Sequence, residues 1–114
     1  MVGLVIVSHS RALATALTDM LLQVASKDIP VSAAGGVGDV RKALGTDAVD
    51  ILEAIESVYS DEGVVVLVDL GSAVLSAETA LEFLAEDMQT QVRLCAAPLV
   101  EGAVAAGVQI SMDG

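Results

Sequence analysis

The 114-residue chain has the length of one domain, and 54% of its residues are apolar, although it contains one Tyr, one Phe and no Trp. Its net charge of −11, from 16 acidic and 5 basic residues, disfavours nucleic acid and anionic membranes as partners, because both attract clustered Lys and Arg. No apolar run approaches the ~18 residues of a membrane helix, the N-terminus lacks a signal-peptide pattern, and Cys95 is the single cysteine, so we expect a cytoplasmic protein without disulfides.

The first part of the chain reads as strand, helix, strand. Residues 2–7 form a continuous apolar run that is typical of a buried strand. Apolar residues then recur at helical spacing over 11–25, and Ser10 is a candidate N-cap. A second strand is predicted over 29–34, and it ends at Gly35 and Gly36.

The rest of the chain repeats this alternation. A helical turn is expected within 38–45, and the helix over 48–59 is capped by Thr46 or Asp47. Ser72 or Ser76 lies near the start of the next predicted helix. The remaining predicted elements are strands over 64–68 and 92–96 and helices over 74–86 and 99–111, and Cys95 is expected in the core.

Short apolar strands that alternate with amphipathic helices predict an α/β fold. We expect a three-layer sandwich over 1–114 as a single domain. Its doubly wound, mainly parallel sheet has four or five strands in the order 2-1-3-4, with helices on both faces.

Polar residues and glycines follow the predicted strands. His9, the only histidine, follows the first strand, and Asp69 follows the third. Open α/β sheets carry their chemistry beyond the carboxyl ends of the strands, where the strand order reverses. In the order 2-1-3-4 these two residues face each other, so that the carboxylate orients one ring nitrogen and leaves the other as a nucleophile.

Candidate phosphate-binding groups surround this pair. Gly71 and Ser72 precede a helix, Ser10 begins another, and helix N-termini present free N–H groups that bind phosphate. Gly35 and Gly36 reach the same edge, where glycine permits a close approach of the backbone. The chain has neither a Walker-type loop nor a nucleotide fingerprint, so we expect it to handle a phosphoryl group without a nucleotide site of its own.

Structural explanations stand beside these assignments. A lone histidine is often structural, Asp69 could be a loop cap, and the serines could be caps alone. Gly35 and Gly36 could form a plain turn. One histidine with scattered carboxylates does not make a metal site, and the Gly-x-Ser-x-Gly turn of serine hydrolases is absent.

Three segments carry a resemblance to a known family: VIVSHSRALA (5–14), VDLGSAVLSAETAL (68–81) and APLVEGAVAAG (97–107). Together they resemble the DhaM family, the phosphotransferase subunits of bacterial dihydroxyacetone kinase, which belong with the mannose-type enzyme IIA domains of the sugar phosphotransferase system. AAGG at 33–36 and LGTDAVDILEAIESV at 44–58 add weaker support. Ser76 stands where the family pattern has asparagine.

The resemblance implies a phosphocarrier that needs no cofactor or metal. His9 would accept a phosphoryl group on Nε2 from phospho-HPr, with Asp69 holding Nδ1, and would pass it to ADP bound on the DhaL subunit. The regenerated ATP would phosphorylate dihydroxyacetone on the DhaK subunit. Family members are usually homodimers, and the acidic surface is expected to attract the basic rim of HPr.

Two other functions use the same histidine. One is a sugar-specific enzyme IIA that donates to an enzyme IIB protein. The other is a regulatory module in which phosphorylation of His9 is only a signal.

Overall fold

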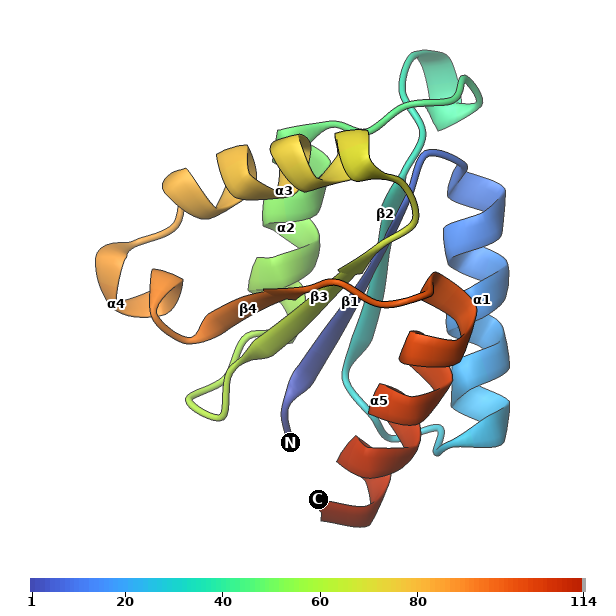
Figure 1. Ribbon diagram of the computed structural model, residues 1–114, viewed down its shortest axis with the longest axis vertical. Helices are drawn as coiled ribbons and strands as arrows, with labels where there is room; N and C mark the ends of the chain where they lie inside the picture. The colour runs from blue at the N-terminus through green and yellow to red at the C-terminus, as the bar shows by residue number, and fades with distance from the viewer. Residues whose placement is uncertain (114) are drawn as a thin grey trace.

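Four parallel strands form the centre of the computed structural model, which describes residues 1–113 (Figure 1). In space they follow the order β2-β1-β3-β4, and each neighbouring pair is parallel. Their bounds are Gly3–Ser8 for β1, Val31–Gly35 for β2, Val64–Val68 for β3 and Val92–Cys95 for β4. The predicted order and direction are confirmed, and the sheet has four strands.

Helices cover both faces of this sheet, as predicted (Figure 1). One face carries α1 (Arg11–Val24) and α5 (Leu99–Asp113), and the other carries α2 (Ala48–Val58) and α3 (Gly71–Glu82). None of the helices within residues 1–113 combines the length and the apolar character needed to cross a membrane.

The alternation of side chains along β1 explains why both faces need covering. Leu4 and Ile6 pack in the cluster beneath α1 and α5, whereas Val5 and Val7 pack in the cluster beneath α2 and α3. All four side chains are fully buried. A strand buried on both faces has apolar residues at every position, which is the pattern of residues 4–7.

Two predicted caps are confirmed at the starts of helices. The Ser10 Oγ accepts a hydrogen bond from the Leu13 N–H at 3.2 Å, and the Asp47 side chain rather than Thr46 accepts one from the Val49 N–H at 3.0 Å. The expected turn within 38–45 lies at Asp39–Arg41, but its φ values at Val40 and Arg41 are positive, so it is a tight turn and not regular helix.

The start of α3 differs from the prediction. The helix begins at Gly71, three residues earlier than expected, and neither Ser72 nor Ser76 caps it. The Asp69 carboxylate accepts a hydrogen bond from the Leu70 N–H at 2.8 Å, which turns the chain directly into the helix. A four-residue helix, α4 (Glu86–Gln89), was not predicted, because so short an element carries no periodic pattern.

The close packing of α2 against β1 gives a test of this architecture. A methyl group on Gly3 would clash with the backbone oxygen of Val58, whereas one on Gly71 would meet no heavy atom within 4 Å. We expect Gly3→Ala to lower the free energy of unfolding by about 2 kcal/mol, the usual cost of overpacking a rigid site. Urea denaturation of Gly3→Ala and Gly71→Ala measures this difference, and equal stability of the two variants would contradict the packing.

Candidate functional site

The parallel pairing of β1 with β3 brings His9 and Asp69 together. Val7 lies opposite Val68 in this pair, so the two chains leave the sheet side by side at its carboxyl edge. The Asp69 N–H donates to the Val7 carbonyl at 3.1 Å, which extends the sheet bonding by one residue. His9 and Asp69, which are 60 positions apart in the sequence, therefore meet beyond the ends of β1 and β3. This is the point at which the strand order reverses direction, because β2 lies on one side of β1 and β3 on the other.

Both oxygens of the Asp69 carboxylate are engaged. Oδ1 lies 3.0 Å from His9 Nδ1, and it also accepts the bond from the Leu70 N–H. Oδ2 accepts hydrogen bonds from the His9 N–H at 3.0 Å and from the Ser8 hydroxyl at 2.8 Å. The carboxylate thus holds the backbone and the ring of the same histidine.

These contacts keep the carboxylate ionised. Burial of Asp69 raises its pKa, but the hydrogen bonds from the His9 ring, the His9 N–H and the Ser8 hydroxyl outweigh burial, and attraction to the His9 ring adds to them. The net result is a pKa of Asp69 below its ordinary value. Above that pKa the carboxylate can only accept hydrogen bonds.

A hydrogen-bond acceptor at Nδ1 determines which tautomer the neutral His9 imidazole adopts. Because Asp69 only accepts, Nδ1 carries the ring proton and Nε2 keeps its lone pair. The Ser72 hydroxyl lies 2.7 Å from Nε2 and donates to it. With 20% of its side chain exposed, His9 presents this nitrogen at the surface of the molecule. The pair can therefore supply a nucleophilic nitrogen that is held in one orientation.

Two helices begin shortly after His9 and Asp69 in the chain, and the start of α3 lies beside Nε2. Helix α1 starts two residues after His9, and α3 starts two residues after Asp69. Within residues 1–113, the N–H groups of Gly71 and Ser72 at the start of α3 have no hydrogen-bond acceptor. Free N–H groups and the positive end of the helix dipole favour an anion at this position.

Three other candidate phosphate-binding residues, Ser10, Gly35 and Gly36, use their backbone N–H groups in hydrogen bonds within the protein. The Ser10 N–H donates to the Ser8 Oγ at 3.0 Å, while its own Oγ accepts the capping bond. The Gly35 N–H donates to the Asp50 carboxylate at 2.9 Å, and the Gly36 N–H donates to the Gly45 carbonyl at 2.9 Å. Both glycine amides already have protein acceptors, so neither amide is free to donate to a phosphoryl group in this arrangement.

Glycine is nevertheless required at both positions. A Cβ atom on Gly35 would clash with the Ser8 carbonyl oxygen, and Gly36 has a φ of 78°, in the region that favours glycine. These residues allow β2 and the following loop to lie close to β1.

Ser8 had no predicted role. It is the fully buried polar residue at the end of β1, and its hydroxyl donates to Asp69 Oδ2 while accepting from the Ser10 N–H. A serine at the last position of an otherwise apolar strand is the signal that could have identified it, since buried hydroxyls require partners.

Cys95 packs against the core cluster beneath α1 and α5, as expected, although its side chain is only partly buried. It lines a hollow of ≈ 330 Å³ at the carboxyl ends of β3 and β4, together with Asp69, Leu70 and Val74. No group of three histidine, cysteine or acidic side chains within residues 1–113 is arranged to hold a metal ion.

The lowered pKa of Asp69 predicts a pH-dependent loss of stability in Asp69→Asn. A group whose pKa is lower in the folded state stabilises the fold above its unfolded pKa, about 3.9, and loses that contribution as the pH falls through the folded value. At pH 7 we expect the free energy of unfolding of Asp69→Asn to be about 2 kcal/mol lower than that of the wild type, because charge-assisted hydrogen bonds are lost.

Urea denaturation between pH 7 and about pH 2 checks this prediction. The difference between wild type and Asp69→Asn should narrow as the pH falls below about 4. Asp28→Asn, at an exposed carboxylate, is the matched control and should show little difference at any pH. A difference for Asp69→Asn that stays constant with pH would contradict the lowered pKa.

The chain is similar to proteins of one family over nearly its whole length. A family model described as EIIA-man, PTS system fructose IIA component, matches residues 3–114. The chain is 51% identical over 109 residues to the Escherichia coli (strain K12) protein "PEP-dependent dihydroxyacetone kinase, phosphoryl donor subunit DhaM". That match covers 95% of this chain and 23% of the E. coli protein.

Two further matches cover most of both chains. A Listeria innocua protein, "PEP-dependent dihydroxyacetone kinase 2, phosphoryl donor subunit DhaM", is 39% identical, and the match covers 96% of this chain and 86% of the relative. A crystal structure of a protein of unknown function superposes with a TM-score of 0.85 at 36% identity, and it covers 100% of this chain and 87% of that one. With the α/β fold and the His9–Asp69 pair at its switch point, this chain belongs to the EIIA-man family of the phosphotransferase system.

Proposed function

We propose that residues 1–114 act as a phosphocarrier in a phosphoenolpyruvate-dependent dihydroxyacetone kinase in the cytoplasm. His9 accepts a phosphoryl group from phospho-HPr and passes it to ADP on DhaL, and the resulting ATP serves DhaK. The observation that carries this proposal is the contact of 3.0 Å between His9 Nδ1 and the Asp69 carboxylate, which leaves Nε2 as the unprotonated, nucleophilic nitrogen. The similarity to relatives named as phosphoryl donor subunits supports the choice of pathway.

Transfer to His9 requires no proton movement. The Nε2 lone pair attacks the phosphorus atom in line, and the P–N bond of the donor histidine breaks with its electron pair returning to the donor nitrogen. The His9 ring then carries a phosphoryl group on Nε2 and a proton on Nδ1, so it is positively charged. The ionised Asp69 stabilises this charge throughout the step.

Transfer onward reverses these changes. A β-phosphate oxygen of ADP attacks the phosphorus, a P–O bond forms, and the Nε2–P bond breaks. The electron pair returns to Nε2, and the ring becomes neutral again with its Nδ1 proton still facing Asp69. The ADP comes on the partner, in keeping with a sequence that lacks a nucleotide-binding motif.

Helix α3 offers the groups that stabilise the phosphoryl oxygens. The free N–H groups of Gly71 and Ser72 point from its first turn, and the Ser72 hydroxyl rotates from Nε2 to a phosphoryl oxygen when the phosphoryl group arrives. The exposed position of Ser72 leaves room for this rotation. Gly71 leaves open space where a side chain would stand.

The surface around His9 is suited to an apolar docking contact. Val40, Leu44 and Leu70 are exposed on loops at this edge, and the hollow lined by Leu70 and Cys95 adjoins Asp69. The donor and the acceptor of a phosphocarrier must each bind and then dissociate. A small apolar patch with a polar rim allows such reversible binding.

Charge is spread unevenly over the molecule. The loops that follow the four strands, with the first three residues of the helices after them, hold three of the five basic residues and five of the sixteen acidic ones. Those eight residues are Arg11, Arg41, Lys42, Asp39, Asp47, Asp50, Asp69 and Glu101. Most of the net negative charge therefore lies away from His9, so apolar contact contributes more to docking than the expected attraction between opposite charges.

A labelling experiment tests the proposed function. Wild type and His9→Gln are incubated with phosphoenolpyruvate, enzyme I and HPr, and incorporation of the phosphoryl group is followed. We expect stoichiometric labelling of the wild type and none of His9→Gln, because glutamine keeps a polar side chain but offers no nucleophilic nitrogen. Labelling of His9→Gln at the wild-type level would contradict the assignment.

The acceptor is identified with the labelled wild-type protein. The label should pass to ADP when DhaL is present. Transfer to an enzyme IIB protein instead would indicate a sugar-specific enzyme IIA, and label that stays on His9 with every acceptor would indicate a regulatory module.

A further inference from the structure

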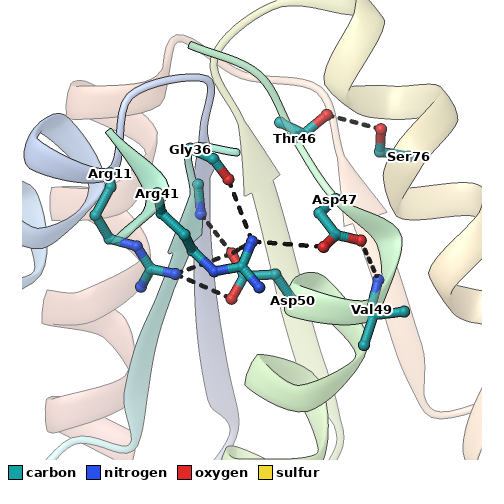
Figure 2. A network of polar contacts seen from close by, with 9 residues as sticks. Arg11, Gly36, Arg41, Thr46, Asp47, Val49, Asp50 and Ser76 are labelled. Atoms are coloured by element: carbon teal, nitrogen blue, oxygen red, sulfur yellow. Dashed lines mark hydrogen bonds and ion pairs between the residues drawn. The ribbon is translucent and has the colours of Figure 1, made fainter. Parts of the chain in front are cut away.

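A second charged cluster lies where β2 ends and where α1 and α2 begin, and it contains Arg11, Arg41 and Asp50 (Figure 2). At its centre is Asp50, in the first turn of α2, with 13% of its side chain exposed. Arg11, the first residue of α1, lies 3.0 and 3.1 Å from the two Asp50 oxygens. Arg41, from the β2–α2 loop, lies 3.8 Å from Asp50 Oδ2.

Asp50 also holds the end of β2. Its Oδ2 accepts the hydrogen bond from the Gly35 N–H at 2.9 Å, and Gly35 is the residue that pairs with Ser8 across the sheet. One carboxylate thus joins the start of α1, the end of β2 and the loop that follows.

The loop itself is held in an unfavourable backbone conformation. Val40 and Arg41 have φ values of 47° and 56°, in the left-handed region that L-residues avoid. Arg41 Nη1 donates to the Gly36 carbonyl at 3.3 Å and lies 3.4 Å from Asp47 Oδ2 (Figure 2). Such a conformation persists only where surrounding contacts determine it, and the Arg41 contacts do so here.

This loop contacts the backbone of His9. The Gly45 N–H donates to the His9 carbonyl at 2.8 Å, and the Gly45 carbonyl accepts from the Gly36 N–H. The His9 N–H is held by Asp69 on the other side. The backbone N–H of His9 is therefore held by Asp69 and its carbonyl by Gly45 in the loop, and Asp50 connects this loop with the start of α1.

We propose that Asp50 is a positioning residue for phosphoryl transfer at His9. Through Gly35, Arg11 and Arg41 it keeps the loop and α1 in the arrangement in which Gly45 holds the His9 carbonyl. The inference rests on the proposed function of His9. It assigns Asp50 no contact with the phosphoryl group.

The partial exposure of the two arginines indicates that the cluster does more than stabilise the fold, and that it also positions the groups around His9. Arg11 and Arg41 are 34% and 31% exposed, and solvent-screened ion pairs contribute little to the free energy of folding. In-line transfer, by contrast, is sensitive to small displacements, since a shift of about 1 Å can reduce a rate about 100-fold. Asp50 itself is 13% exposed, so the cluster contributes to stability as well as to the geometry of the site.

The test compares Asp50→Asn with Glu53→Gln, an acid-to-amide change one turn further along α2 at an exposed position. The rate of His9 phosphorylation is measured over a range of phospho-HPr concentrations, well below the temperature of unfolding of each protein. We expect Asp50→Asn to lower kcat about 10- to 100-fold with KM changed less than about threefold, and Glu53→Gln to behave as wild type.

A second measurement reports the position of the loop directly. Hydrogen exchange of the Gly45 amide, observed by NMR, should accelerate at least about tenfold in Asp50→Asn, because its bond to the His9 carbonyl opens more often. Arg41→Gln removes the loop contacts and the ion pair of Arg41 with Asp50, but it leaves Arg11 and the Gly35 N–H bound to Asp50. It should show the same acceleration with a smaller fall in kcat.

Each outcome has a distinct meaning. If Asp50→Asn folds and its kcat is unchanged, the positioning role is overturned. It is also overturned if kcat falls while hydrogen exchange of the Gly45 amide is no faster than in the wild type. If Asp50→Asn does not fold, Arg41→Gln decides, and wild-type kcat in that variant overturns the role. Failure of the wild-type protein to be phosphorylated on His9 would instead refute the proposed function.

Discussion

The Asp69 carboxylate is the group on which the rest of the site depends. It joins the ends of β1 and β3 by accepting hydrogen bonds from the Ser8 hydroxyl, the His9 N–H and the Leu70 N–H while facing His9 Nδ1. Four contacts on two oxygens leave the side chain one arrangement. The His9 ring orientation and the early start of α3 both follow from it.

The sheet makes this arrangement possible at low cost. Its apolar strands, buried on both faces, hold β1 and β3 in register up to Val7 and Val68, so the next residues emerge as neighbours. Ser8 is fully buried, but its hydroxyl donates to Asp69 and accepts from the Ser10 N–H. Burying this polar group therefore leaves no hydrogen bond unsatisfied. On the β2 side, the Gly45 N–H donates to the His9 carbonyl, and the Asp50 carboxylate accepts from the Gly35 N–H.

Much of the fold could be predicted from the sequence, because continuous apolar runs and helical periodicity report burial directly. The expected strand order 2-1-3-4 makes the first and third strands neighbours, and the meeting of His9 and Asp69 could be predicted from that order. The start of α3 was misplaced because a side-chain contact from Asp69, rather than a serine cap, sets it.

Other parts of the site depend on contacts that no local pattern encodes. Gly35 and Gly36 looked available for phosphate, but their amides bind Asp50 and Gly45, residues that only the folded loop brings near. Arg11 and Arg41 meet at Asp50 for the same reason. Ser8 was visible as a polar residue ending an apolar strand, but its partner lies 61 residues away.

The central claim is that Asp69 holds Nδ1 and so directs phosphorylation to Nε2. Nitrogen and phosphorus NMR of the ¹⁵N-labelled protein, after phosphorylation by phosphoenolpyruvate, enzyme I and HPr, tests it most directly. We expect phosphorus coupled to Nε2 of His9, with a proton retained on Nδ1. Phosphorus on Nδ1, or a phosphorylated ring whose Nδ1 has lost its proton at neutral pH, would contradict it.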